Sequence, residues 1–268
     1  MRILLLNPNT SAAITERLLA AAQAVAQPST EIVPLTAPRG VPYIATRAEA
    51  QIGGAVALEM LAEHHDKADA AIIAAFGDPG LMGARELFDI PVVGLAEAAM
   101  LAACMLGRRF AIVTFARALG PWYEECVAMH GLSGRCAAIR MLDESFTDIA
   151  EVQDEKEDVI VALAQRAVVE DEADAVILAG APLAGLAAKV ADRIPVPVVD
   201  QAQAALKLAE ALVALKPRKA TAGTFRRPAP KPTQGLPPAL AARIEHRPRH
   251  PERSEGSRGD ATGSDATD

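Results

Sequence analysis

Three carboxylates stand where strands of this chain are expected to end, and carboxylates at such places can carry acid and base chemistry. Asp78 lies in the turn Phe76-Gly77-Asp78-Pro79-Gly80, while Glu97 and Asp200 each follow a Pro-Val-Val segment. Two carboxylates in different environments can serve as proton donor and proton acceptor. Each also has a structural interpretation, because Asp-Pro-Gly is ordinary turn chemistry and a carboxylate stabilises a helix N-terminus. The sequence leaves both interpretations open.

Cysteine and histidine give weaker signals. The cysteines form neither an even framework nor a CxxC pair, which is typical of reduced structural thiols in a cytoplasmic protein: Cys104, Cys126 and Cys136. His64 and His65 are expected on a charged helix and His130 at a helix end, all facing solvent. No metal-ligand spacing, phosphate loop or Ser/His/Asp arrangement stands out, so the sequence predicts no metal site.

The elements that would position these groups repeat along the chain. The stretch from Ala70 to Gly80 is an apolar run that breaks into a Gly/Asp/Pro turn, a pattern typical of a strand buried on both faces. The same pattern recurs from Ala175 to Gly185, 105 residues later, and an Asp precedes each copy.

Two more segments repeat at nearly the same offset. Arg2-Ile-Leu-Leu-Leu resembles Arg109-Phe-Ala-Ile-Val, and Pro91-Val-Val resembles Pro197-Val-Val. Three matched strands predict a duplicated α/β unit of about a hundred residues. Two such halves facing each other would bring the loops after Ala75 and Gly180 to opposite sides of one cleft.

Strands and helices are expected to alternate along the whole body of the chain. Further predicted strands cover residues 31–35 and 136–141, and the predicted helices cover 12–26, 48–67, 81–88, 97–106, 121–129, 153–171, 184–191 and 202–215. The predicted division is a first lobe of residues 1–98 with 201–232, a second lobe of residues 99–200, and a disordered tail, 233–268. The tail is rich in Pro, Gly, Ser, Asp and Arg and has few large apolar residues to offset the entropy of ordering.

Net charge and hydropathy limit the classes of molecule that this protein is expected to bind. The net charge is −7, but the segment from Lys216 onward carries 11 Lys/Arg and six Asp/Glu, so the body alone is at −12. An acidic body argues against a nucleic-acid surface. The four apolar residues after Arg2 are too few for a signal peptide, and no run approaches a membrane span, so we expect a cytoplasmic protein without membrane contact. A homo-oligomer is one of the expected assembly states.

Several motifs together carry a resemblance. Asn7-Pro8-Asn9-Thr10, Phe76-Gly77-Asp78-Pro79-Gly80, Pro91-Val-Val-Gly-Leu-Ala-Glu-Ala-Ala99 and Gly223-Thr-Phe-Arg-Arg-Pro228 resemble hydantoin racemases of the aspartate/glutamate racemase superfamily, over about residues 1 to 230. The resemblance implies two parallel-sheet lobes related by a pseudo-two-fold, with the ligand between them. It also implies chemistry without a cofactor, in which two cysteines move a proton on opposite faces of a carbon next to a carbonyl.

This chain departs from the family pattern at both cysteine positions. The residue before Phe76 is Ala75, and the residue at the second position is Gly180, so neither side chain carries a proton. Asp78, Glu97 and Asp200 could replace the missing thiols as acid/base groups, but each also has a structural interpretation. The resemblance therefore implies an isomerase-family protein for small carbonyl or carboxylate compounds whose two-thiol mechanism is in doubt. The alternatives are a non-catalytic binding protein, or a related lyase with other acid/base residues.

The predicted ligand-binding residues stand in loops that follow predicted strands, where open α/β sheets bind ligands. They are Asn9, Thr10, Tyr43, Phe76, Gly77, Thr114 and Ala181. Asn9 and Thr10 could instead cap the first helix, and Tyr43 could instead pack its loop down.

Overall fold

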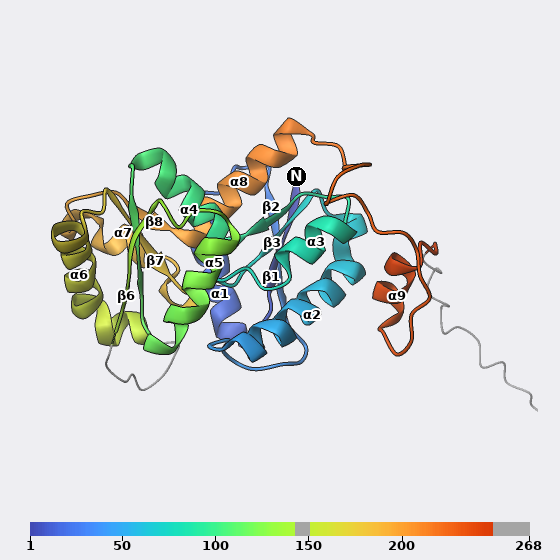
Figure 1. Ribbon diagram of the computed structural model, residues 1–268, viewed down its shortest axis with the longest axis horizontal. Helices are drawn as coiled ribbons and strands as arrows, with labels where there is room; N and C mark the ends of the chain where they lie inside the picture. Colours follow the sequence, from blue (N-terminus) through green and yellow to red (C-terminus); the bar gives the residue numbers. More distant parts are fainter. Residues whose placement is uncertain (143–150, 249–268) are drawn as a thin grey trace, which may run out of the picture.

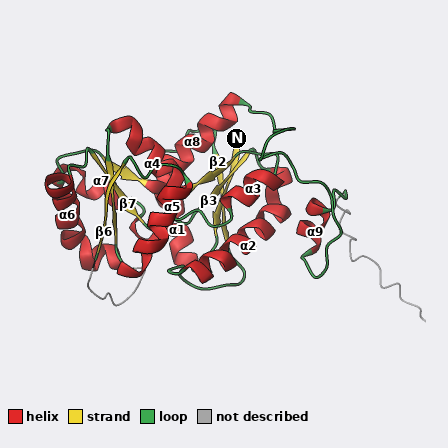
Figure 2. Cartoon of the chain, in the orientation of Figure 1, coloured by secondary structure: helices red, strands yellow, loops and turns green. Residues whose placement is uncertain are grey.

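The chain forms two four-stranded parallel sheets that are flanked by helices, as the ribbon and the secondary-structure cartoon show (Figures 1 and 2). This computed structural model describes residues 1–142 and 151–248. The predicted α/β architecture with two similar lobes is therefore confirmed.

The two sheets have the same strand order. The first is β2-β1-β3-β4 and the second is β6-β5-β7-β8. Their bounds are β1 Arg2–Asn7, β2 Glu31–Thr36, β3 Ala70–Ile73, β4 Val92–Gly94, β5 Phe110–Thr114, β6 Cys136–Met141, β7 Ala175–Ala179 and β8 Val198–Asp200. All residues of the central strands β3, β5 and β7 are buried, as their unbroken apolar runs require.

Helices fill the intervals between the strands. Their bounds are α1 Ala12–Gln23, α2 Arg47–His64, α3 Leu81–Leu87, α4 Leu95–Leu106, α5 Gly120–Met129, α6 Val152–Asp171, α7 Leu186–Val190, α8 Gln201–Leu215 and α9 Pro238–Ile244. Local sequence explains where several begin: Ser11 caps α1, and Thr46 with Glu49 forms a capping box on α2. None of the helices in the described ranges is long and apolar enough to cross a membrane.

The duplication extends to individual hydrogen bonds. In the first lobe, the Asp69 carboxylate accepts from the backbone N–H of Arg2 at 2.7 Å. In the second, the Asp174 carboxylate accepts from the N–H of Arg109 at 2.9 Å. Asp69 thus joins the start of β3 to the start of β1, and Asp174 joins the start of β7 to the start of β5. This shared hydrogen bond explains why an Asp precedes both copies of the repeat.

Helices α4 and α8 join the two lobes. They lie side by side between the sheets (Figure 1), and α8, which follows the second sheet, packs on β3 and β4 of the first. Helix α4 follows the first sheet and packs on β7 and β8 of the second. The lobe boundaries at residues 98 and 200 remain a proposal, because α4 places Ala98 in the core of the first lobe and Met100 in that of the second.

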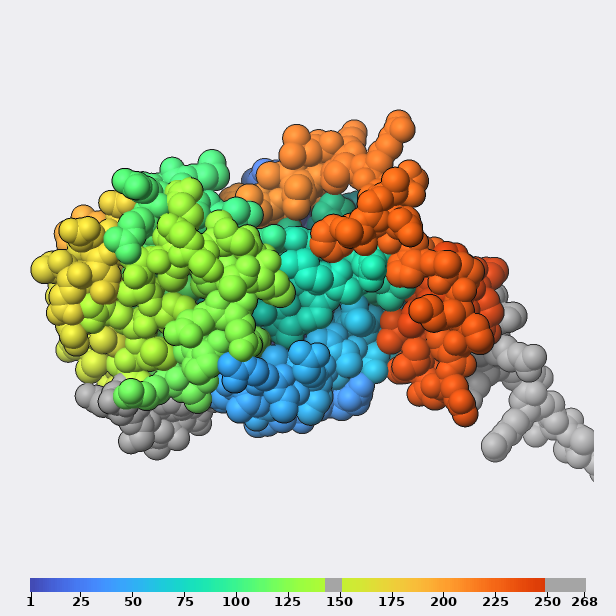
Figure 3. All heavy atoms as spheres, viewed as in Figure 1, coloured from blue at the N-terminus to red at the C-terminus, as the bar shows by residue number. Residues whose placement is uncertain are grey.

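The prediction of disorder from residue 233 is wrong over residues 233–248. Helix α9 lies on α2 at the end of the first lobe that faces away from the second lobe (Figure 3). Leu240 and Ala241 are buried there, and Arg243 donates a hydrogen bond to the Leu87 carbonyl and pairs with Asp89. The composition of this segment, with many Pro and Arg residues, gives no sign of a core of its own. One apolar turn is enough to order the helix, because α2 provides a surface on which it packs. The rest of the predicted tail lies outside the described residues.

Candidate functional site

One pocket lies between the lobes at the carboxyl ends of the central strands. Its cavity volume is about 30 Å³, set within about 350 Å³ of empty space that includes open solvent. Ala75 and Gly180 both line it, as the duplication predicts for equivalent loops. The full lining consists of Asn9, Ile14, Tyr43, Ile44, Ala75, Phe76, Phe115, Trp122, Tyr123, Gly180, Ala181 and Pro182.

Aromatic rings form most of the pocket wall. Of nine aromatic residues in the chain, five stand here: Tyr43, Phe76, Phe115, Trp122 and Tyr123. The rings touch one another, with Phe76 and Tyr123 centroids 4.7 Å apart and Tyr43 and Phe115 centroids 5.7 Å apart. Such a wall offers flat apolar faces to a ligand.

The wall at Gly180 has no room for a side chain. Gly180 has φ 105° and ψ 134°, a conformation that favours glycine. The Gln201 side-chain amide accepts a hydrogen bond from the Gly180 N–H and donates one to the Gly180 carbonyl. A Cβ at this position would lie 2.4 Å from the Phe115 ring and 3.4 Å from the Tyr123 hydroxyl. The Phe115 ring therefore fills the space that a thiol at position 180 would need.

The Tyr123 hydroxyl is buried at the wall near Gly180. It lies 3.4 Å from the position that a Cβ on Gly180 would take. The hydroxyl of the nearby Thr114 donates to the Ala179 carbonyl at 2.9 Å. Burial, with the nearby Tyr43, raises the pKa of Tyr123 well above 10, so this phenol stays neutral.

Tyr43 comes from the loop between β2 and α2. Its ring packs on Phe115, while its hydroxyl is buried and has no hydrogen-bond partner among the described residues. Burial, and next the charge of Glu49, raises the pKa of Tyr43 above its ordinary value of 10. Both interpretations of Tyr43 from the sequence fit this geometry, since its ring packs on Phe115 and the residue lines the pocket.

The turn after β1 is held by its own polar side chains. The Asn7 amide donates to Asn9 Oδ1 at 3.0 Å and to Thr15 Oγ1 at 2.9 Å, and the N–H of Ser11 also donates to Asn9 Oδ1 at 2.9 Å. Asn9 thereby reaches the pocket wall. Thr10 does not line the pocket, and its N–H donates to the Val41 carbonyl.

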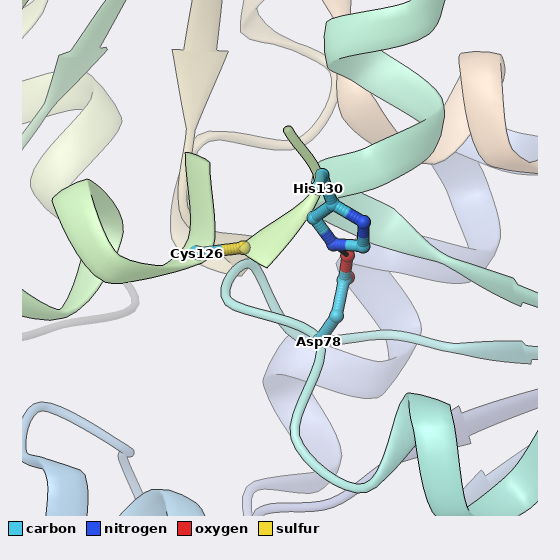
Figure 4. A group of neighbouring side chains, drawn as sticks. All are labelled: Asp78, Cys126 and His130. Atoms are coloured by element: carbon cyan, nitrogen blue, oxygen red, sulfur yellow. Dashed lines mark hydrogen bonds and ion pairs between the residues drawn. The ribbon is translucent and has the colours of Figure 1, made fainter. Parts of the chain in front are cut away.

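Asp78 and Glu97 lie outside the pocket, in an ionic cluster with His130 from the end of α5. The Asp78 carboxylate accepts from the N–H groups of Ala96 and Glu97 at the start of α4, both at 2.8 Å. His130 Nε2 lies 3.0 Å from Asp78 Oδ2, and His130 Nδ1 lies 3.4 Å from Glu97 Oε1. Figure 4 shows the carboxylate and the imidazole pointing toward one another.

The cluster is charged and mostly hidden from water. The His130 side chain is 2% exposed, so the prediction that it faces solvent is wrong. Burial alone would lower its pKa, but Asp78 and Glu97 outweigh burial and raise the pKa to about 9. Burial would raise the pKa of Glu97, yet His130 and Arg85 bring it down to about 2.

A metal ion does not fit this cluster, although Asp78, Cys126 and His130 place ligand atoms within 4.8 Å of one another. Both nitrogens of His130 face carboxylates, so the ring is protonated and offers no lone pair. Cys126 lies to one side (Figure 4), and burial, followed by the charges of Asp78 and Glu97, raises the pKa of its thiol well above 9. An uncharged thiol is a poor metal ligand.

Asp200, the third predicted carboxylate, also serves a helix N-terminus. It caps α8 by accepting from the N–H groups of Ala202 at 2.9 Å and Gln203 at 3.1 Å, and it accepts from Gly185 at 2.5 Å. Burial raises the pKa of Asp200 despite these bonds. The structural interpretation thus accounts for Asp78 and Asp200, and ion pairing accounts for Glu97.

Some of the ligand-binding residues predicted from the sequence line the pocket. Asn9, Tyr43, Phe76 and Ala181 line it, whereas Thr114 lies behind Tyr123. Gly77 lines a separate groove between α2 and α5, and Trp122 packs where a Cβ of Gly77 would be.

Sequence reasoning missed the aromatic residues that follow β5. The signal was present, because Phe115 comes directly after a predicted strand and the only tryptophan stands beside one of two tyrosines in Pro121-Trp122-Tyr123. In a chain with 3% aromatic residues such a cluster near a strand end marks a site.

The arrangement limits the chemistry of the pocket. Among the described residues, no carboxylate, thiol, imidazole or ammonium group lines it, and its polar groups are the Asn9 amide, two neutral phenols and backbone amides. These groups donate and accept hydrogen bonds at neutral pH. Removing a proton from carbon needs a group whose pKa lies near the working pH, which a phenol of raised pKa does not provide.

Comparison with known proteins agrees with this architecture. The profile of the Asp/Glu/Hydantoin racemase family matches residues 3–209. The hydantoin racemase of Paenarthrobacter aurescens is 34% identical over 233 residues, which cover 86% of this chain and 99% of that protein.

Solved structures give the same result. The allantoin racemase of Klebsiella pneumoniae superposes with a TM-score of 0.84 at 36% identity, covering 90% of this chain and 98% of the other. The allantoin racemase of Pseudomonas fluorescens superposes with a TM-score of 0.81 at 35% identity, covering 88% and 100%. The chain therefore belongs to the Asp/Glu/Hydantoin racemase family.

Proposed function

We propose that this chain is a cofactor-independent isomerase-type protein that holds a small cyclic carbonyl compound, of the hydantoin and allantoin kind, in the pocket between its lobes. The family and the position of the pocket support this ligand class. The observation that carries the mechanistic part is the pair Ala75 and Gly180, which face one pocket and carry no proton. The two-thiol route is thus absent, and any proton transfer uses other groups.

A second candidate function is binding without catalysis. It is favoured by the pocket lining, which among the described residues holds no group with a pKa near neutrality, and by the engagement of all three candidate carboxylates in caps and ion pairs elsewhere. Such a protein would keep the ligand class and lose the reaction.

Proton exchange at carbon separates the two candidates. The purified protein is incubated with single enantiomers of 5-substituted hydantoins and of allantoin in D₂O, and optical rotation and deuterium incorporation are followed together. Exchange with loss of rotation above the buffer control supports the isomerase. Exchange with retained rotation indicates one working base, whereas binding without exchange supports the second candidate.

The variant Tyr123→Phe is the matched control for catalysis by the hydroxyl nearest Gly180, since it removes only one oxygen. If exchange in the wild type is abolished in this variant, the phenol handles the proton. No binding of any cyclic carbonyl compound to the wild type, measured by calorimetry, would contradict both candidates.

A further inference from the structure

The pocket between the lobes is too small in this structure for the ligand class proposed for it. Its cavity volume is about 30 Å³. One water molecule occupies about the same volume in the liquid, whereas sites for small molecules usually enclose about 300–1,000 Å³. A cyclic carbonyl compound therefore enters only when part of the pocket wall moves.

A much larger groove lies on the other side of one wall residue. The groove has a cavity volume of about 600 Å³ and is formed between α2 of the first lobe and α5 of the second (Figure 1). Among the described residues, Trp122 alone lines both the pocket and the groove. Its indole ring is thus the partition between the two volumes.

Three segments of the chain pass from the pocket into the groove, so the two volumes are neighbours along their whole shared wall. Each segment lines the pocket with its first residues and the groove with its later ones. The segments are 43–44 with 47–58, 75–76 with 77–80, and 122–123 with 125–129. A displacement of the Trp122 ring would therefore join the groove to the pocket.

The position of the indole depends on a glycine. Gly77 has φ 107°, and a Cβ on it would lie 2.3 to 2.7 Å from three atoms of the Trp122 ring. The ring thus occupies space that no other residue at position 77 would leave free. Its other neighbour is the Tyr123 ring, with centroids 5.7 Å apart.

An exposed ion pair holds the two sides of the groove together. Arg47, the first residue of α2, donates from Nε and Nη2 to the Glu125 carboxylate on α5 at 2.6 to 2.9 Å. Both side chains line the groove and are more than half exposed, at 60% and 56%. Exposed pairs stabilise by at most about 1 kcal/mol, so this one opens readily. The buried pair of His130 with Asp78, at the end of α5, is expected to stay closed.

We propose that the groove between α2 and α5 is the entrance to the pocket, that the Trp122 indole is its gate, and that the Arg47–Glu125 ion pair keeps the gate shut. This inference rests on the proposed function and specifies how its ligand reaches the site. When the indole moves away from Gly77, the pocket and the groove become one volume with room for a substituted five-membered ring.

Trp122 is the only tryptophan of the chain, so its fluorescence reports the gate without any ligand. The variant Glu125→Gln breaks the ion pair and is expected to raise the acrylamide quenching constant about twofold to fivefold. The control Glu59→Gln breaks another exposed pair of α2, with Arg39, outside the groove, and should leave quenching unchanged. Unchanged quenching in Glu125→Gln, or an equal rise in the control, would overturn the role of the pair.

Two glycine variants test the gate itself. Gly77→Ala places a methyl group against the indole and is expected to raise quenching more than Glu125→Gln does. Gly40→Ala is the matched control, because Gly40 has a similar φ of 121° but its Cβ would meet only Ile52, at 3.9 Å. Thermal melting verifies that both variants fold. Equal quenching in the two variants would show that Gly77 does not set the position of the ring, and would contradict the gate.

Stopped-flow mixing with hydantoin, followed by Trp122 fluorescence, tests the entrance. In Glu125→Gln the association and dissociation rates are both expected to rise by the factor found in quenching, while the dissociation constant stays within about twofold, because the pair acts equally on free and liganded protein. Unchanged rates despite increased quenching would overturn the entrance. A wild type that binds no cyclic carbonyl compound would contradict the proposed function instead, and the quenching series would still decide the gate.

Discussion

The two loops that face each other across the pocket, residues 75–80 and 180–185, occupy equivalent places in a repeated unit but are held in opposite ways. In the first lobe the carboxylate is in the loop, where Asp78 reaches out to the start of α4. In the second lobe the carboxylate is at the strand end, where Asp200 caps α8 and reaches back to Gly185 in the loop. Both arrangements tie the loop to the N–H groups at a helix start.

The loops also differ in their charge partners. Asp78 has a cation, His130, which comes from the second lobe, so the first loop is bound to both lobes. The hydrogen bonds that Asp200 accepts within the described residues all come from backbone N–H groups. In both copies a carboxylate joins the loop to a helix start, but the carboxylate stands at different places in the two copies and only Asp78 is paired with a histidine.

The largest expected effect compares these two carboxylates. Asp78→Asn breaks the buried pair with His130, turns an NH₂ toward the α4 N-terminus, and is expected to lower the free energy of unfolding by about 3–5 kcal/mol. Asp200→Asn keeps a good N-cap residue and is expected to cost about 1–2 kcal/mol, chiefly at the Gly185 N–H. Urea denaturation measures both. Equal losses would mean that the His130 pair adds nothing to the first loop.

The next effect compares the two family thiol positions. Gly180→Cys places a side chain at φ 105° and against the Phe115 ring, so it is expected to cost about 2–4 kcal/mol. Ala75→Cys adds one atom beside the open pocket and is expected to stay within about 1 kcal/mol.

A double-mutant cycle isolates the contact that sets this asymmetry. Phe115→Ala should be less destabilising in the Gly180→Cys background than in the wild type, because it opens the space that the new side chain needs. Strict additivity would show that the backbone conformation of Gly180, and not the ring, excludes a thiol from this wall.

A further expected effect, smaller than that of Asp78→Asn, is a pH dependence of stability from the ionic cluster. The folded-state pKa of His130, about 9, lies above the ordinary 6.5, so its stabilisation is complete below pH 6.5 and is lost as the pH rises through 9. The loss is expected to be about 2 kcal/mol, below the full value of the shift because solvent screens part of it. His130→Asn should remove this slope, and an unchanged slope in that variant would assign it to another group.

The acid side has the opposite sign. Because the pKa of Glu97 is about 2, against an ordinary 4.5, its stabilisation is complete above pH 4.5 and is lost as the pH falls through 2. Denaturation curves from pH 2 to 10 therefore test both partners of the cluster in one series.

Local sequence carried enough information for the elements and for the duplication. An apolar run such as 70–73 has no polar face, so only a doubly covered parallel strand suits it, and the Asp before it recurs because each copy makes the same bond to the first strand. The positions of Ala75 and Gly180 followed from these repeats, since equivalent strand ends meet at one pocket.

The sequence could not reveal contacts between residues far apart in the chain. His130 looked exposed because it stands at the predicted end of a helix, yet α5 carries it to two carboxylates 52 and 33 positions away. Likewise α9 looked disordered because its own composition cannot form a core, but α2 supplies the partner surface. The order of elements was decided by short-range patterns of apolar residues. The partners of each charge, and the ring that occupies the space beside Gly180, were decided only when the two lobes came together.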